Sequence, residues 1–197
     1  MSPTTPPSFT TKRLVFRAPE SADCAEPDGF LYSLLNDEGV QHGLTAGSIR
    51  PYRKSDVEKF VADSIAASSV YSVFCLKGDD TSSVMDLEPV GWITLEKVKV
   101  PHRKAMFGLA VAPKHEGQGY AKEAMDWLLE RAFDGYGLNK VEGEVLGWNE
   151  RALRVYKSVG FVVEGQRRQT LWQNGAFIDD YMIGLLASEW RERHQKS

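Results

Sequence analysis

The chain has 197 residues, of which 42% are hydrophobic and 26% charged, and its formal net charge is −3. This composition predicts one globular domain with a full hydrophobic core, and two widely separated cysteines argue against a disulfide framework. The net negative charge argues against a nucleic-acid partner. No apolar run approaches the ~20 residues of a membrane span, and the N-terminus has no signal-peptide core, so we expect a cytoplasmic protein without a membrane partner.

The predicted elements alternate between strands and helices along residues 11–197, after a Pro- and Thr-rich tail, residues 1–10, that we expect to be flexible. In chain order we expect a strand over 11–17, helices over 28–35 and 55–67, strands over 70–76, 90–98 and 103–111, a helix over 120–133, a strand over 140–146, a helix over 149–159, strands over 161–166 and 177–186 and a helical turn over 188–193. The stretch 39–50 is interpreted as a loop, and Ser55 with Glu58 has the spacing of a helix capping box. This order predicts a mixed α/β domain with hairpins first and a strand–helix–strand crossover in the middle.

The most informative stretch is residues 107–127, where a short apolar strand leads into a loop with Gly117 and Gly119 and then into a helix. Glycine lets backbone N–H groups approach an oxyanion closely, and the first turn of a helix offers unpaired N–H groups at the positive end of its dipole. These features together predict a site for a pyrophosphate that needs no basic side chain. A Rossmann loop is disfavoured because Lys122 stands where its third glycine would be, and no G-K-[ST] phosphate loop occurs.

Two motifs in this part of the chain resemble those of a known family. The segment Glu116-Gly117-Gln118-Gly119-Tyr120-Ala121 is similar to an acyl-CoA loop written Q/R-x-x-G-x-G/A. The segment from Asn149 through Ala152 and Tyr156 to Gly160-Phe161 is similar to N-x-x-A-x-x-x-Y-x-x-x-G-F. Both motifs resemble the GNAT superfamily of N-acetyltransferases, in particular the branch with ribosomal-protein, spermidine and antibiotic N-acetyltransferases.

The resemblance implies a fold and a cosubstrate. The fold is α/β (α+β), a single GNAT-like domain in which a mixed, mostly antiparallel sheet of about seven strands is flanked by helices and holds acyl-CoA between splayed central strands. The cosubstrate is acetyl-CoA, and no metal is expected because the histidines show no metal-ligand spacing. By resemblance, the cofactor contacts are Leu109, Ala110, Val111, Gly117, Gln118, Gly119, Tyr120, Ala121, Asn149, Ala152, Tyr156 and Lys157.

The same resemblance implies a reaction, which is direct attack of a primary amine on acetyl-CoA in a ternary complex. Tyr156 is the candidate general acid that protonates the departing thiolate, and the N–H of Val111 would polarise the thioester carbonyl. The general base stays open, because residues 105–108 of the strand before the loop contain no carboxylate. The alternatives for the base are Glu96, Glu142, Glu144 and a water chain.

The family pattern is broken at one position, because Glu116 stands where Gln or Arg is usual. A carboxylate is unfavourable beside a pyrophosphate unless it points away, and Gln118 or Lys122 could compensate for it. This departure keeps two alternatives in view, a non-catalytic acyl-CoA-binding protein on the same fold and a transferase for a longer acyl group. The acceptor, a small-molecule or peptide amine, is expected near residues 27–60 and the last hairpin. An exposed final strand would allow a homodimer, and a monomer is the other expectation.

Overall fold

The computed structural model describes residues 9–44, 49–78 and 83–195, so most of the predicted tail lies outside the described residues. The strands form one seven-stranded sheet in the order β1-β2-β3-β4-β5-β7-β6. Their bounds are β1 (Leu14–Arg17), β2 (Ser68–Leu76), β3 (Pro89–Glu96), β4 (Lys104–Val111), β5 (Lys140–Leu146), β6 (Val162–Gln173) and β7 (Ala176–Leu186). Every neighbouring pair is antiparallel except β4 and β5, which are parallel and joined by a helical crossover. The mixed, mostly antiparallel sheet is therefore confirmed.

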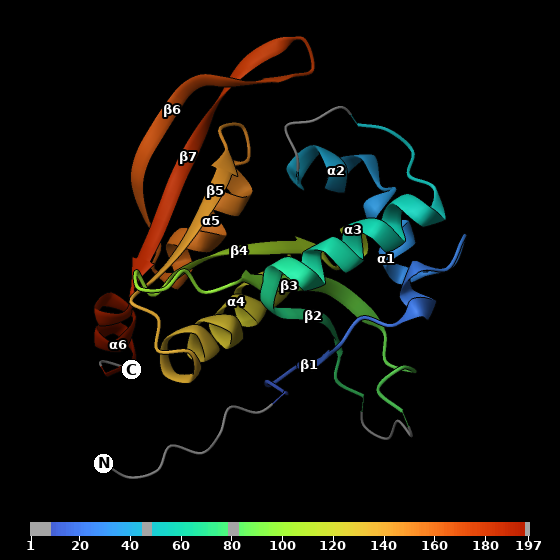
Figure 1. The fold of residues 1–197 in the computed structure, drawn as a ribbon, viewed down its shortest axis with the longest axis horizontal. Helices are drawn as coiled ribbons and strands as arrows, with labels where there is room; N and C mark the ends of the chain where they lie inside the picture. Colours follow the sequence, from blue (N-terminus) through green and yellow to red (C-terminus); the bar gives the residue numbers. More distant parts are fainter. Residues whose placement is uncertain (1–8, 45–48, 79–82, 196–197) are drawn as a thin grey trace.

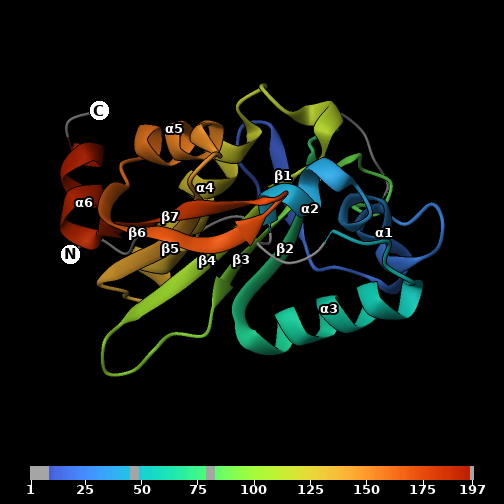
Figure 2. The same ribbon diagram turned by 90° about the horizontal axis from the view of Figure 1, so that it is seen from above.

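The helices cover both faces of this sheet. Within the described residues they are α1 (Phe30–Leu35), α2 (Glu38–Leu44), α3 (Lys54–Ala67), α4 (Tyr120–Glu130), α5 (Glu150–Val159) and α6 (Ala187–Gln195). Helices α4 and α5 lie on one side of the sheet and α3 on the other (Figures 1 and 2). The buried side chains form two clusters, one that includes α4, α5 and α6 and one that includes α1 and α3. No helix among the described residues is long and apolar enough to cross a membrane.

Helix α4 follows its predicted apolar pattern. Met125 and Leu128 are fully buried, and Trp127 stacks on Phe16 of β1 with ring centroids 3.7 Å apart. The α-helix ends at Glu130, and a π-helical turn over Arg131–Gly135 continues it. Because these side chains anchor α4 to the sheet, its N-terminus is held at the end of β4.

Strands β4 and β5 separate along their length. They pair only through residues 104–106 and 140–142, and beyond that point they run apart (Figure 1). The ring of Phe107 occupies the space beside Gly143, where an added Cβ would lie 2.5 Å from the ring. The predicted splay of the central strands is therefore present.

Residues 39–50 were predicted to be a loop, and this was wrong for the part that forms α2, Glu38–Leu44. The carboxylate of Asp37 accepts the N–H of Val40 at 2.9 Å and so caps the helix. The buried amide of Gln41 donates to two backbone carbonyls at 2.8 Å each. These contacts offset the glycines of α2, which cost about 0.5–1 kcal/mol each in a helix.

The start of α3 also differs from the prediction. Ser55 was expected to cap this helix, but the N-cap residue is Arg53 and the helix begins at Lys54. The carboxylate of Asp56 accepts the backbone N–H of Arg53 at 3.0 Å, which satisfies one of the unpaired groups at the helix start. The capping acid is therefore Asp56, where Glu58 was expected.

The last hairpin is longer than predicted, because β6 continues beyond residues 161–166 to Gln173 and pairs with β7 up to the turn. Asn174 and Gly175 form that turn and both have positive φ, as a tight hairpin turn requires. Strand β7 lies between β5 and β6, so the edge strand is β6. The prediction that the final strand is exposed at the sheet edge, which favoured a dimer, was therefore wrong. The oligomeric state, monomer or homodimer, stays a prediction.

Candidate active site

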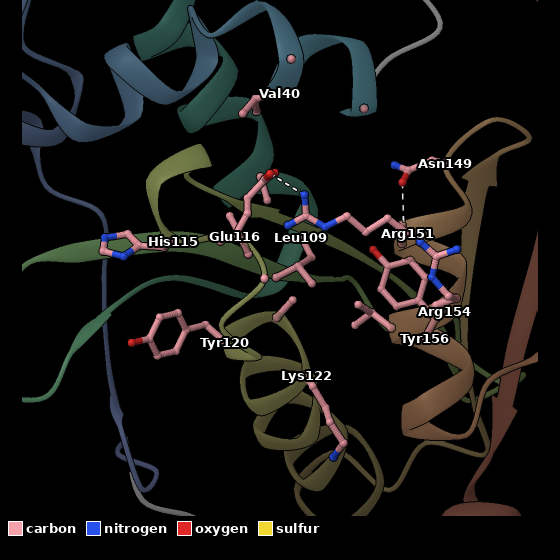
Figure 3. Close-up of a pocket in the computed structure, with 18 of the residues that line it drawn as sticks. Val40, Leu109, His115, Glu116, Tyr120, Lys122, Asn149, Arg151, Arg154 and Tyr156 are labelled. Carbon is pink, nitrogen blue, oxygen red and sulfur yellow. Dashed lines mark hydrogen bonds and ion pairs between the residues drawn. The ribbon is translucent and has the colours of Figure 1, made fainter.

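A cleft of about 710 Å³ opens where β4 and β5 separate, a volume typical of small-molecule sites. Its walls come from the end of β4, the loop and first turn of α4, the beginning of α5 and helix α2 (Figure 3). The predicted residues that line it are Leu109, Ala110, Val111, Gly117, Gly119, Tyr120, Ala121, Asn149, Ala152 and Tyr156. The fold thus brings the strand, the glycine loop and the second motif to one site.

The glycine loop has a conformation that favours glycine. Gly117 and Gly119 have φ values of +76° and +82°, in the left-handed region that side chains with a Cβ rarely adopt. Gly119 is the N-cap of α4, and no side chain caps this end of the helix. The first N–H groups of α4 therefore have no capping side chain, and the first turn of the helix lines the cleft, as an anion site requires.

A brace of two residues just before β1, Thr11 and Arg13, contacts this loop and the first turn of α4. The guanidinium of Arg13 donates to the carbonyl of Gln118 at 2.9 Å and to the carboxylate of Glu123 at 2.7 Å. The hydroxyl of Thr11 donates to the same carboxylate at 2.6 Å. Burial alone would raise the pKa of the Glu123 carboxyl, but the hydrogen bonds from Thr11 and Arg13 outweigh burial and hold that pKa below its ordinary value.

The open edge of β4 offers backbone groups to the cleft. The N–H of Ala112 donates to Val90 of β3 at 2.8 Å, and the register pairs Val111 with Gly91. Hydrogen-bonded pairs alternate along an antiparallel ladder, so the N–H and C=O groups of Leu109 and Val111 point away from β3. They face the side from which β5 has diverged, where an extended ligand can pair with them.

Tyr156 lies on α5 at the inner wall of the cleft. Its side chain is 8% exposed, and its ring packs edge-on against Phe107 at 4.9 Å. The hydroxyl points into the cleft, toward β4 (Figure 3). Burial raises the pKa of the Tyr156 phenol above its ordinary value, so the phenol stays protonated at neutral pH and can donate a hydrogen bond.

Asn149 begins α5 as its N-cap. Its side-chain oxygen accepts the N–H of Ala152 at 3.0 Å, and Gly160 ends the helix with φ of +121°. Asn149 is therefore a helix cap. Asn149 also lines the cleft, so the start of α5 lies at its wall.

An ion pair connects the two motifs across the cleft. The guanidinium of Arg151, at the start of α5, contacts the carboxylate of Glu116 (Figure 3). Gln118 and Lys122, which the sequence suggested as compensating residues, are turned elsewhere: the Gln118 amide donates to the carbonyl of Lys114 at 3.2 Å, and Lys122 extends away along α4. The cation that neutralises Glu116 therefore comes from the second motif.

A family described as "Acetyltransferase (GNAT) domain" matches residues 13–162, which is more than half of the chain. The chain belongs to the GNAT acetyltransferase family. Among solved structures, spermidine N-acetyltransferase from Vibrio cholerae in complex with CoA and spermine is similar, with 24% identity, a TM-score of 0.74 and coverage of 92% of this chain and 99% of that chain. This likeness supports the fold.

Curated relatives fall in the same family. Spermidine N(1)-acetyltransferase of Vibrio cholerae is 29% identical over 106 residues, which are 54% of this chain and 61% of that relative. An uncharacterized N-acetyltransferase from a Bacillus subtilis prophage, YokL, is 26% identical over 189 residues, 94% of this chain and 97% of that protein. The chain spans less than two thirds of the length of the spermidine acetyltransferases it matches.

Several residues suggested by the sequence lie outside the cleft of this GNAT domain. Glu96 is at the far end of β3, where it pairs with Ser68 of β2, while the other end of β3 pairs with the cleft end of β4. Glu144 faces away on β5 and pairs with Arg167 at 2.5 Å. Lys157 is exposed on α5 and does not line the cleft, nor does Gln118. The described carboxylates that line the cleft are Glu116 and Glu150.

The sequence analysis placed the acceptor near residues 27–60 and the last hairpin, but it did not name the residues at the end of the GNAT cleft beside α2. Val40 and Leu44 line it, together with Trp148 from the loop before α5. The imidazole of His42 stacks on Trp148 with ring centroids 4.1 Å apart, and the Trp148 indole N–H donates to Gln173 at 2.7 Å. The apolar spacing of Val40 and Leu44 and the capping acid before them were the available signal for a helix, but no local pattern indicates contacts with the distant hairpin.

The prediction that no metal is needed remains a prediction. Across residues 9–44, 49–78 and 83–195, no group of three or more His, Cys, Asp and Glu side chains is placed to hold a metal ion. His115 lines the cleft but is buried, and its Nε2 lies 3.2 Å from the carboxylate of Glu88.

Proposed function

We propose that this GNAT domain transfers an acetyl group from acetyl-CoA to a primary amine by direct attack in a ternary complex. The observation that carries the proposal is the continuous cleft from the uncapped start of α4, along the open edge of β4, to the buried phenol of Tyr156. Membership in the GNAT family and the curated spermidine acetyltransferases among its relatives support the same reaction.

In the proposed complex, the backbone N–H groups of residues 117–121 bind the diphosphate of CoA. The pantetheine arm extends along β4 and pairs with the backbone of Leu109 and Val111. The N–H of Val111 donates to the thioester oxygen and stabilises negative charge that develops there during attack. The cofactor side of the cleft therefore aims the acetyl group at the space between β4, α5 and α2.

The transfer forms a C–N bond and breaks the C–S bond of the thioester. The amine nitrogen attacks the acetyl carbon, CoA leaves as a thiolate, and the phenol of Tyr156 gives that thiolate a proton. The nitrogen must lose a proton, and we propose that it passes to solvent through water. A water route is favoured over Glu96, Glu142 and Glu144 because none of these carboxylates lines the cleft, and Glu142 is also paired with Lys104 and Lys140.

The acceptor end of the cleft favours an amine with little additional positive charge. Its walls beside α2 include Val40, Leu44 and Trp148. Of the described carboxylates in the cleft, Glu116 pairs with Arg151 and Glu150 pairs with Arg154 at 3.3 Å. A polyamine carries several positive charges, which unpaired carboxylates in the site would stabilise. Because the carboxylates in this cleft are paired, we propose a monoamine or a peptide N-terminus as the acceptor over a polyamine.

The test is the release of CoA thiol from acetyl-CoA, measured with a panel of amines: N-terminal peptides, aromatic and aliphatic monoamines, an amino sugar and spermidine. We expect amine-dependent release, with kcat/KM for a monoamine or peptide above that for spermidine. Tight CoA binding without release for any amine would support the non-catalytic acyl-CoA-binding protein instead. Propionyl- and butyryl-CoA in the same assay test the longer-acyl alternative.

A further inference from the structure

The phosphate loop of this chain carries an acidic residue, Glu116, and the structure pairs it with a cation from a different helix. We propose that Arg151 binds the diphosphate of CoA, and that Glu116 positions the Arg151 guanidinium for this contact. In this role Arg151 supplies, from α5, a donor that the family motif usually places in the loop itself. The inference rests on the proposed function, because it requires CoA in the cleft.

The geometry of the pair fits a ligand between the two motifs. Arg151 extends from the beginning of α5 toward the glycine loop and meets Glu116 there (Figure 3). Both residues line the cleft, and their side chains are 51% and 41% exposed. The bond to Glu116 uses Nη1 of Arg151. A guanidinium has five N–H donors in a planar fork, so it can hold a carboxylate and a phosphate oxygen at the same time.

The other cations that line the cleft are engaged away from the glycine loop. Lys122 pairs with Asp126 on its own helix at 2.6 Å. Arg154 pairs with Glu150 at 3.3 Å, also within one helix. Among the described lysines and arginines that line the cleft, Arg151 is therefore the one whose side chain contacts the glycine loop, where the diphosphate would bind.

The charges give this arrangement a recognisable energetic signature. A half-exposed ion pair contributes little by itself, so the Arg151 fork can adjust to an incoming phosphate at small cost. A charge-assisted contact from arginine to phosphate is short and strong. If Arg151 were missing, Glu116 would face the diphosphate as an uncompensated negative charge. The effect of removing the Glu116 charge should therefore depend on whether Arg151 is present.

The test is a double-mutant cycle on CoA affinity, measured by calorimetry on the full chain. We expect Arg151→Ala to raise the Kd for CoA about tenfold or more. Glu116→Gln alone should raise the Kd about two- to threefold, because it releases Arg151. In the Arg151→Ala background, Glu116→Gln should instead lower the Kd, because it removes the repulsion. An unchanged Kd for Arg151→Ala, or the same sign for Glu116→Gln in both backgrounds, would overturn the inference.

The matched control is the pair formed by Arg191 and Asp134, which lies outside the cleft and is 50% and 46% exposed. Arg191→Ala makes the same change in net charge and should leave the Kd for CoA unchanged; a loss as large as that of Arg151→Ala would mean a general charge effect and would overturn the inference. Thermal unfolding verifies that each variant folds, and Arg151→Lys, which keeps the charge without the fork, should fall between the wild type and Arg151→Ala.

Dephospho-CoA tells which phosphate Arg151 binds. Because the diphosphate is assigned, the loss in Arg151→Ala should persist with dephospho-CoA, and its disappearance would overturn that assignment. The outcomes also separate this inference from the proposed function. If the wild type does not bind CoA, the proposed function fails; if the wild type binds CoA and Arg151→Ala binds it equally well, only the role of Arg151 fails.

Discussion

The two ends of the cleft are built in different ways. At the proposed cofactor end, the groups assigned to the ligand are backbone N–H and C=O groups of one segment, from Leu109 to Ala121, which contains two left-handed glycines. At the proposed acceptor end, the walls are residues of α2 and of the loop before α5. The tip of the last hairpin supports them from outside the lining, because the Gln173 amide donates to the carbonyl of His42, 131 residues away in sequence. One end depends on local conformation, and the other depends on tertiary packing.

This difference predicts separable consequences of mutation. Substitutions in the glycine loop should change the Kd for CoA. Substitutions at the contact between α2 and the last hairpin should change the KM for the amine. Tyr156 lies where the two ends meet, so its substitution should change kcat.

Tyr156→Phe should have the largest effect, because it removes the proton donor and little else from a packed position. We expect kcat to fall about a hundredfold, with small changes in the KM for either substrate, in steady-state thiol-release assays. Tyr136→Phe is the control, because the Tyr136 hydroxyl donates to the carbonyl of Ser69 at 2.9 Å, away from this cleft. A Tyr156→Phe enzyme with full kcat would remove the acid assignment.

Gly117→Ala should weaken CoA binding about tenfold and leave the KM for the amine nearly unchanged. An added Cβ at Gly117 meets nothing within 4 Å, so the cost comes from its φ of +76°, which is unfavourable for a residue with a side chain by about 1–2 kcal/mol. Gly135→Ala is matched, since its Cβ also meets nothing within 4 Å and its φ is not positive. Equal CoA affinities of the two variants, by calorimetry, would argue against a conformational requirement in the loop.

Gln173→Ala should affect the acceptor end. It removes the bonds by which the hairpin tip holds the indole of Trp148, at 2.7 Å, and the carbonyl of His42, at 3.1 Å. We expect the KM for the amine to rise about fivefold while the Kd for CoA stays constant, because one net hydrogen bond contributes about 1 kcal/mol. Gln166→Ala, which removes a contact with Asp179 lower in the same hairpin, is the control. A shift in CoA affinity of equal size would mean that the two ends are not separable.

Glu123→Gln, which removes the carboxylate held by Thr11 and Arg13, should have the smallest effect, and this effect is on thermal stability. The pKa of the Glu123 carboxyl is lower in the folded state than its ordinary value of 4.5, so the ionised carboxylate stabilises the fold at pH values above 4.5. This contribution is lost as the pH falls through the lowered pKa of the folded state. The Tm difference between wild type and Glu123→Gln should therefore be present at pH 7 and shrink as the pH falls below 4.5. Glu130→Gln, at an exposed site on the same helix, should show no such difference; a pH-independent gap for Glu123→Gln would contradict the brace.

The sequence predicted the backbone structure of the proposed cofactor end well, because its signals are local. The order of apolar strand, Gly117, Gly119 and helix start is written in one segment, and the structure has strand, left-handed glycines and helix at those residues. The strand at 140–146 and the helix from Asn149 to Gly160 were also predicted correctly for local reasons, namely residue periodicity and caps.

The acceptor end and the general base could not be predicted in the same way. Helix α2 is held by the Gln41 side chain and by packing on distant residues, which override its glycines. Glu96 and Glu144 share the chemistry of a base, but strand register places one at the wrong end of β3 and turns the other toward Arg167. Arg151 was hidden for a similar reason, since its partner Glu116 lies 35 residues earlier in the chain.

The most direct test of the central claim is a crystal structure of the chain with CoA bound. The account predicts that the diphosphate accepts hydrogen bonds from the backbone N–H groups of residues 117–121, and that the pantetheine arm pairs with the edge of β4 so that the sulfur lies near the Val111 N–H and the Tyr156 hydroxyl. A diphosphate bound away from that loop, or a β4 edge left empty by the arm, would contradict it.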